Sequence, residues 1–537
     1  MMRRLSFRKQ RNEVNEKESI SVTGLVSSDL SENQQYIRQT FGLSADIIMR
    51  VLRLGADDQI AVLIAHIDGL IDNSLLNSSV IRPINLDSAL LEKKCADPLS
   101  AYNAVRNHVL GGSELTEVSL MKDVVQSICQ GSCAIMVEGN PMALILDLRS
   151  WQERNITEPV SEPSVRGIRE GFVETFRTNT AILRRHIMDP RLRIDETTLG
   201  EISHTAIGIV YIQGVAKENI VQEVKDRITR IKTDSMQGTG MMEEYIEDAS
   251  WSPFPTLLRT ERVDRAIGAL LQGRVVIIIA GTPFVLIAPV TLTMFLTAPD
   301  DYFERFPIGS LVRTLRLITF LMSLTLPAIY VAIITFHQEM LPTSLVLAIA
   351  AQREGVPFPA AVEAFILDIG FEIFREASIR VPVVFGPAVS ILGVLFLGQT
   401  AVSAGLVSPF MVIVISVTAI TSLGVPIYSL GIAARLIRFP LLFLAGSLGL
   451  FGVIWGIAAI IIHLMALRSF GVPYLEPFGP VVGSDLKDAI MRSPWWSINK
   501  RPKFIAGRNK IRQPAGQKPG PPPAPPAGRQ GSKGGRK

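Results

Sequence analysis

Six charged side chains lie close together in a segment of the chain that is otherwise rich in Ile, Phe, Val and Ala. The segment AVEAFILDIGFEIFREASIR contains four acids and two bases, which are Glu363, Asp368, Glu372, Glu376, Arg375 and Arg380. Residues three or four positions apart face the same side of a helix, so Asp368, Glu372 and Glu376 form one stripe. The two arginines are spaced to pair with Glu372 and Glu376, which would neutralise and orient these acids. Carboxylates placed among apolar helices attract cations, bind basic groups or relay protons.

A second stripe on the same predicted helix is apolar and contains Val362, Phe365, Ile366 and Ile369. A charged side chain at the centre of a lipid bilayer costs about 2.5–3.5 kcal/mol even on the most lenient scale. The helix must therefore face protein, water or lipid headgroups. Three interpretations remain open from the residues alone: an amphipathic helix at the membrane surface, a pore helix repeated around the axis of a homo-oligomer, and a charged helix inside a transporter. In the pore interpretation, the four acids line the pore and the apolar stripe forms its gate.

The elements around this helix are of two kinds. The chain has 537 residues, of which 48% are hydrophobic. Up to about Ser250 the sequence is typical of a soluble protein, whereas apolar runs near the roughly 20 residues that cross a bilayer recur between Val275 and Leu467. We therefore predict a multidomain protein, in which an N-terminal soluble α/β or α+β domain, possibly of two lobes, precedes an α-helical polytopic membrane domain.

The predicted domain boundaries follow from the same changes in composition. Residues 1–44 are polar and are predicted to be disordered, and residues 481–537 form a basic, proline-rich tail that is expected to be disordered beyond about Lys500. The tail is expected to lie near anionic lipid headgroups and not on nucleic acid, because no aromatic or folded platform accompanies its charge. Between these ends we predict a soluble domain at 45–250, a juxtamembrane helix at 251–274 and a membrane domain at 275–480. The expected spans are 275–298, 317–336, 383–404, 409–430 and 439–467, with the charged helix 358–380 in addition.

The distribution of charge predicts that both ends of the chain lie on one side of the membrane. Both ends are basic, and basic segments favour the cytosolic side. Five crossings would place the ends on opposite sides, so the charged helix 358–380 is expected to supply a sixth. No apolar core of a secretory signal follows the positive start, and three cysteines form no disulfide framework. We therefore expect the N-terminal domain to be cytosolic.

The sequence contains no signature of catalysis. A P-loop, an H-E-x-x-H motif and a nucleophile elbow are all absent, and the six histidines are scattered. Cys129 and Cys133 have no second Cys or His pair beside them, so we interpret them as structural and predict no metal site. The chain is therefore predicted not to be an enzyme and to use no cofactor.

A series of longer motifs is more distinctive than any of these short patterns. They are EGFVETFRTNTAILRRHI (170–187), SPFPTLLRTERVDR (252–265), GTPFVLIAPVT (281–291), REGVPFPAAVEA (353–364), FREASIRVP (374–382), GLVSPFMVIVISVTAI (405–420), RSFGVPYLEP (468–477) and SPWW (493–496). In this order they resemble the A subunit of spore germinant receptors, from about residue 45 to 502. Two positions depart from the expected pattern: Ala280 stands where Asp is usual and Ile427 where Asn is common, and either change would alter gating or packing.

The resemblance implies a multi-pass protein of the spore inner membrane with its N-terminal domain in the spore core. It implies a transporter-like B subunit that senses the nutrient and a lipoprotein C subunit as partners, together with membrane lipids. It also implies a homo-oligomer, expected to be a pentamer, that acts as a nutrient-gated ion channel and triggers germination. The related stage V sporulation A-type branch shares the motifs and remains open.

Two other functions remain open beside the channel. A secondary transporter or permease subunit would take up substrate by itself, and internal inverted repeats would favour it, although none is visible. A membrane-anchored scaffold of the germination complex would carry its function in the N-terminal domain, so that any simple anchor could replace the spans.

Overall fold

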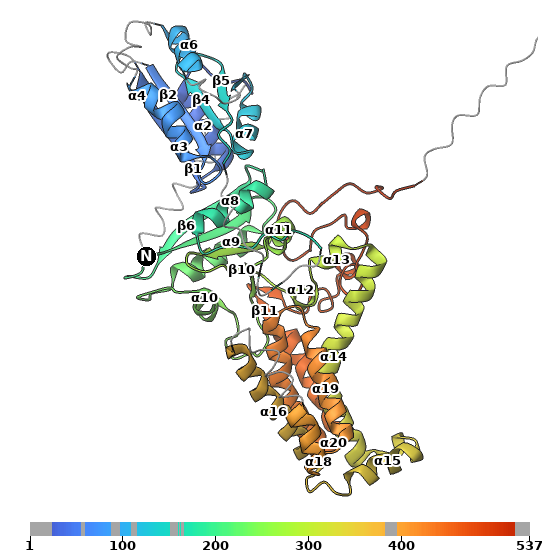
Figure 1. Cartoon of the computed structure of the whole chain (residues 1–537). Coiled ribbons are helices and arrows are strands. Elements are labelled where there is room, and N and C mark those ends of the chain that lie inside the picture. The colour runs from blue at the N-terminus through green and yellow to red at the C-terminus, as the bar shows by residue number, and fades with distance from the viewer. Residues whose placement is uncertain are drawn as a thin grey trace, which may run out of the picture. The chain divides into compact units, whose positions relative to one another are not determined.

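The structure is a computed structural model, and it describes residues 24–54, 60–86, 97–108, 115–150, 159, 162, 166–381 and 395–520. The chain folds into two compact units, whose elements are labelled in Figure 1. The first unit comprises the described residues within Met1–Thr157, Gly171–Gln213 and Ile277–Pro283. The second comprises those within Glu158–Glu170, Gly214–Val276 and Phe284–Lys537.

A five-stranded antiparallel sheet forms the centre of the N-terminal part, with the order β1-β2-β4-β5-β3. Successive side chains of a strand point to opposite faces, so in β2 Val62 and Ile64 join one apolar core while Leu63 and Ala65 join another. Helices α3, α4 and α6 cover the first core, and α2 and α7 cover the second. The elements are α2 (Leu30–Phe41), β1 (Ile47–Leu54), β2 (Ile60–Ile67), α3 (Asn73–Leu76), α4 (Arg82–Leu86), α6 (Pro98–His108), β3 (Leu115–Val118), α7 (Met121–Cys129), β4 (Cys133–Val137) and β5 (Ala143–Leu146).

A second five-stranded sheet has the order β6-β7-β9-β10-β8. Strands β6 and β7 form a long antiparallel hairpin, in which Leu192 pairs with Ile212 and Leu199 with Thr205. All five side chains of β9 are buried, as expected for a strand that is covered on both faces. The elements of this region are α8 (Phe176–His186), β6 (Leu192–Leu199), β7 (Thr205–Ile212), α9 (Glu218–Thr229), α10 (Thr239–Ile246), β8 (Leu258–Thr260), α11 (Val263–Gln272), β9 (Val275–Ile279) and β10 (Val285–Ala288).

The C-terminal half of the chain is mainly helical, and α14, α16, α19 and α20 lie side by side (Figure 1). A shared apolar core joins them through small and branched side chains, among them Ala328 of α14, Ala364 of α16, Ile415 of α19 and Leu442 of α20. The helices are α12 (Leu292–Leu296), α13 (Asp300–Phe303), α14 (Phe306–Phe336), α15 (Thr343–Arg353), α16 (Ala360–Arg380), α18 (Ala401–Ser403), α19 (Pro409–Leu423), α20 (Tyr428–Ala466) and α21 (Gly483–Leu486). A short hairpin of β11 (Arg468–Ser469) and β12 (Val472–Pro473) follows α20.

Helix α20 consists of two antiparallel helical segments, a first leg at 428–448 and a second leg at 450–466, which meet at Gly449. Gly449 has φ 63° and ψ −144°, which interrupts the helix. A Cβ on Gly456 would lie 2.5 Å from the side chain of Leu441, although the two residues would be about 22 Å apart along a continuous helix. A Cβ on Gly452 would likewise meet the backbone of Leu444. The chain therefore reverses at Gly449, and the small residues of the second leg allow it to pack closely on the first.

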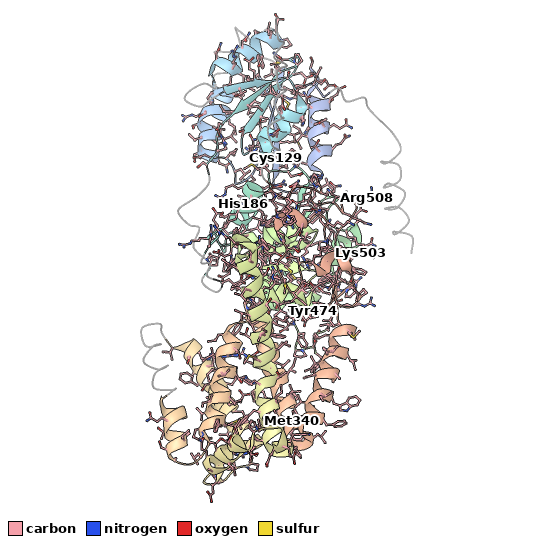
Figure 2. The ribbon with its side chains drawn as sticks, turned by 90° about the vertical axis from the view of Figure 1, so that its right-hand side faces the viewer. Cys129, His186, Met340, Tyr474, Lys503 and Arg508 are labelled. Atoms are coloured by element: carbon pink, nitrogen blue, oxygen red, sulfur yellow. The ribbon has the colours of Figure 1, made fainter. Side chains whose placement is uncertain are left out.

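Two of the described helices, α14 and α20, are long and apolar enough to cross a membrane, and α19 is a shorter apolar helix of 15 residues. The end of α14 lies at the reversal, since Phe336 and His337 crowd Gly449. At the opposite end of the bundle, the Oγ of Ser252 lies 2.8 Å from the Nε2 of His463. Figure 2 labels Met340, just after α14, and Tyr474, just after the second leg of α20, at these two ends.

The C-terminal segment folds back onto the part of the second unit that precedes the bundle. The backbone N–H of Gly507 donates to the carbonyl of Val215 at 2.8 Å, and the Nε of Arg501 donates to the carbonyl of Leu271 at 2.8 Å. Ile505 is fully buried. Figure 2 labels Lys503 and Arg508 on this segment. Residues that precede the helical bundle in the sequence and residues that follow it therefore belong to one folded region.

The predicted fold class is confirmed in its order: a sheet-containing N-terminal region of mixed α and β structure precedes a helical C-terminal region. The predicted span 275–298 is wrong, because these residues form β9, β10 and α12. The sheet-containing region thus extends beyond residue 250. The predicted juxtamembrane helix 251–274 is also wrong over its first half, where β8 precedes α11. A central strand buried on both faces is as apolar as a membrane segment, so hydrophobicity alone does not separate the two.

The ends of the chain contain more structure than the predicted disorder. Within 1–44, residues 24–44 include α2, whose N-terminus is capped by the carboxylate of Asp29 accepting from the N–H of Ser31 at 2.8 Å. Ile37 and Phe41 of α2 are buried in the core, which holds this helix in place. In the tail, residues 481–520 include α21 and the buried Ile505. Residues 1–23 and 521–537 lie outside the described part of the chain.

The remaining predicted spans correspond to helices with different bounds. The span 317–336 lies within α14, which begins earlier at Phe306, and 439–467 lies almost wholly within α20. The span 409–430 contains α19 and the start of α20, while the charged helix 358–380 is α16. Most of the predicted span 383–404 lies outside the described residues, and its end contains α18.

Candidate functional site

The charged helix α16 places its first two acids inside the bundle. Glu363 is fully buried and accepts hydrogen bonds from the N–H and the Oγ of Ser408, both at 2.5 Å. The Nε of Arg353 lies 3.8 Å from the second oxygen of Glu363. Ser408 is also the N-cap of α19, so this acid joins the first turn of α16 to the start of α19.

Asp368 lies one turn and a half further along α16 and is paired with a base from a different helix. Its carboxylate lies 2.5 Å from the guanidinium of Arg438 on the first leg of α20, and the two side chains are only 1% and 2% exposed. Two opposite charges buried together stabilise each other strongly, while either one alone would be costly. The pair therefore fixes α16 against α20.

Glu372 lies on the same stripe, closer to the edge of the bundle. One oxygen of its carboxylate lies 2.9 Å from the guanidinium of Arg375 and 2.8 Å from that of Arg435 on α20. Its side chain is 37% exposed, whereas Arg435 is almost buried. Glu372 therefore joins both helices and still reaches the surface of the chain.

Glu376 and Arg380 lie at the exposed end of α16, 2.7 Å apart. Their side chains are 60% and 79% exposed, so this pair contributes little to stability. The acids of the stripe thus pass from full burial at Asp368 to exposure at Glu376. From the sequence all of these acids are equal candidates for the pore lining, whereas in the structure they differ in burial and in their partners.

The apolar stripe of α16 divides in the same way. Val362, Ile366 and Ile369 are exposed on the surface of the described chain, with Ile373 continuing the row. Phe365 instead points into the bundle, where its ring stacks on that of Phe439 with centroids 6.1 Å apart. An exposed row of branched apolar side chains suits contact with lipid or with another protein surface.

Three arginines from other helices partner these acids and are not among the residues predicted from the sequence, namely Arg353, Arg435 and Arg438. A signal exists for the last two, because they are three positions apart in the apolar segment GIAARLIRFP and so face one side of a helix. Buried charges in such a segment require partners of opposite sign. Arg375 and Arg380 pair with Glu372 and Glu376 as predicted. Within the described residues, no group of three or more His, Cys, Asp or Glu side chains could hold a metal ion.

Comparison with known proteins agrees with this arrangement of motifs. The family model described as "Bacillus/Clostridium GerA spore germination protein" matches residues 35–504. The chain is 41% identical to spore germination protein KA of Bacillus subtilis, over 93% of this chain and 90% of that protein. It is 40% identical to spore germination protein B1 of Bacillus subtilis, over 91% of this chain and 99% of that protein.

A solved structure also aligns with part of the chain. It is the crystal structure of the N-terminal domain of the A subunit of the Bacillus megaterium spore germinant receptor GerK3. The alignment covers 49% of this chain and 96% of that chain, with 29% identity and a TM-score of 0.40. Since the family model and both relatives cover nearly the whole sequence, this chain belongs to the Bacillus/Clostridium GerA family of spore germination proteins.

Proposed function

We propose that this protein is the A subunit of a nutrient germinant receptor in the spore inner membrane. In this proposal it assembles as a homo-oligomer, expected to be a pentamer, into an ion channel whose opening triggers germination. A transporter-like B subunit and a lipoprotein C subunit complete the receptor. The observation that carries the proposal is the gradient of acids on α16, from the buried Asp368–Arg438 pair to the exposed Glu376, inside a bundle of apolar helices.

The path of the chain supports a multi-pass membrane domain. Glu363 and Ser408 bring the start of α16 and the start of α19 to the same end of the bundle. Helix α16 has 21 residues and is about 30 Å long, so its end lies near the other end of the bundle. Together with α14, α16, α19, the two legs of α20 and the predicted span 383–404, most of which lies outside the described residues, the proposal has six crossings. An even number agrees with the shared folding of the residues that precede α14 and those that follow α20.

The acids of α16 would act in two different ways. Asp368 and Glu363 are buried inside the chain against Arg438 and Ser408, so in this proposal they position α16 and do not meet passing ions. Glu372 and Glu376 are the acids that an aqueous path could reach, and rings of such carboxylates favour cations. In an oligomer, the exposed row of Val362, Ile366 and Ile369 would supply either the apolar gate or the contact between subunits.

A flux assay tests this function directly. The purified chain, alone and together with its B and C partners, is reconstituted into vesicles, and the ratio of K⁺ to Cl⁻ flux is measured. The double variant Glu372→Gln/Glu376→Gln is expected to lower this ratio severalfold without preventing assembly, and Glu244→Gln, on the exposed face of α10, is the matched control. Unchanged flux and selectivity in the double variant would refute the pore role of these acids.

The alternatives give different results in the same vesicles. A transporter or permease subunit would take up substrate in a saturable manner by itself. A scaffold of the germination complex would show no flux, and the spans could be replaced by one foreign span without loss of germination. A germination assay with such a chimera separates the scaffold from both transport functions.

A further inference from the structure

The second unit contains a cavity of about 430 Å³ that lies outside the helical bundle. Helix α11, the segment that carries α12 and α13, and the C-terminal segment between residues 476 and 512 form its walls. This volume lies within the range of small-molecule sites in proteins. The walls are partly apolar, with Met294, Phe303 and Ile505, and partly polar.

One charged wall residue, Glu476, is buried, with its side chain 3% exposed. Neither of its carboxylate oxygens makes a hydrogen bond of good geometry within the described residues, although the backbone N–H of Phe504 and the carboxyl group of Asp485 lie close to it. The guanidinium of Arg274 provides the opposing charge nearby, while its Nε donates to the Oε1 of Gln272 and its Nη1 to the carbonyl of Pro289. The carboxylate of Asp485 is also nearby and repels a second negative charge.

The other acids of the walls are satisfied by the protein. Asp264 lies 2.7 Å from the guanidinium of Arg262. Asp488 accepts from the hydroxyl of Tyr302 at 2.5 Å, and Asp485 accepts from the backbone N–H of Lys503 at 2.9 Å. Among the wall acids of the described chain, Glu476 therefore stands apart.

A buried carboxylate with no donor is unfavourable, and it becomes favourable when a ligand supplies the donor. We propose that this cavity binds a small organic molecule carrying a primary ammonium or guanidinium group, with Glu476 as the counter-ion of that group. An organic cation fits better than a metal ion, since no set of three metal-ligating side chains exists within the described residues. The apolar part of the wall would contact the alkyl portion of the molecule.

Binding of simple probes to the full chain in detergent tests the proposal. The probes are n-butylammonium chloride, n-butylguanidinium chloride and the neutral 1-butanol, and saturation-transfer NMR with titration reports binding. Both cations are expected to bind, and 1-butanol is not. Glu476→Gln is expected to weaken binding of the cations at least about tenfold, because a charged hydrogen bond is lost. Glu244→Gln, an exposed Glu-to-Gln change, is the matched control and is expected to bind as the unaltered chain does.

The outcomes separate the proposal from its rivals. Thermal unfolding of Glu476→Gln confirms that the variant is folded, and Glu476→Asp, which keeps the charge, is expected to retain part of the affinity. Equal binding by Glu476→Gln and the unaltered chain, or no binding of either cation, would overturn the proposal. A lysine of the chain beyond residue 520 has the same ammonium group as the proposed ligand and is therefore a rival occupant of the cavity. Appreciably tighter binding to a chain that ends at residue 520 would assign the cavity to that tail and overturn the small-molecule proposal.

Discussion

Asp368 of α16 and Arg438 of α20 form an ion pair at 2.5 Å in which both side chains are almost completely buried. The residues are seventy positions apart in the chain, and the pair joins two different helices of the bundle. A few positions away, Glu372 and Arg435 join the same two helices at 2.8 Å. The register between α16 and α20 is therefore fixed by two charged contacts, one of them sealed from solvent.

Removal of one partner of the buried pair is predicted to be severe. Asp368→Asn leaves the Arg438 guanidinium buried without a counter-charge, which costs about 3–5 kcal/mol of unfolding free energy. Thermal unfolding of the detergent-solubilised chain measures the effect. Glu376→Gln, in the exposed pair, is the control and is expected to change stability by less than about 1 kcal/mol. A double variant Asp368→Leu/Arg438→Met should recover most of the loss; no recovery would show that the pair has a role beyond charge compensation.

The reversal of α20 predicts opposite effects for two Gly-to-Ala changes. Gly449 has φ 63° and is crowded by Phe336 and His337, so Gly449→Ala is expected to destabilise the chain by about 1–2 kcal/mol or more. Gly431 lies within the first leg with no atom near its Cβ position, so Gly431→Ala is expected to be neutral or to stabilise by up to about 1 kcal/mol. Thermal unfolding compares the two variants, and equal effects would argue against a reversal at Gly449.

The first unit contains a buried ion pair of its own. The guanidinium of Arg184 on α8 lies 2.6 Å from the carboxylate of Asp46 and also donates to the Oγ of Ser44 at 2.9 Å. Arg184→Ala is expected to cost about 3–5 kcal/mol, measured as faster hydrogen exchange in β1 and α8. Arg191 pairs with Asp189 at the surface, so Arg191→Ala should leave exchange almost unchanged. Similar exchange in both variants would contradict the assignment of Arg184 as the stabilising partner.

The fold-back of the C-terminal segment predicts the sidedness of the chain in a membrane. Single cysteines at Glu244 and at Lys510, both exposed, are introduced into a variant without native cysteines. A membrane-impermeant maleimide added outside sealed, uniformly oriented vesicles is expected to label both positions or neither, since the two residues belong to one folded region. Labelling of one position alone would mean an odd number of crossings.

The stability of the second unit is predicted to depend on Glu476 between pH 4.5 and 7. Burial raises the pKa of this carboxyl to about 7, with Asp485 raising it further and Arg274 opposing the shift. An unfolded glutamate ionises near pH 4.5, so the folded state holds more protons in this window and stability falls as pH rises through it. The loss is at most about 3 kcal/mol. Glu476→Gln should remove this part of the pH dependence; identical pH profiles for the two proteins would exclude it.

The amphipathic and apolar patterns in the sequence identified most elements by type. The charged segment forms α16 as predicted, because its charged residues are spaced three or four positions apart, as on one side of a helix, and no Pro interrupts it. The prediction of a membrane span from Val275 is wrong, since the β-branched residues of a buried strand are as apolar as a membrane helix. Gly281, Thr282 and Pro283 divide that run into two pieces of strand length. These residues indicate a turn between strands, but a hydropathy average over a long window hides them.

The sequence by itself determined the family, the order of a sheet-containing region before a helical one, and the presence of acids on one helix among apolar neighbours. Only the tertiary structure decided which acids are neutralised. Arg438, Arg435 and Ser408 reach α16 from distant parts of the chain, and the register of packed helices selects these contacts. The surroundings of Glu476 are decided in the same way, because whether a buried carboxylate meets a hydrogen-bond donor depends on every element packed around it and not on its neighbours in sequence.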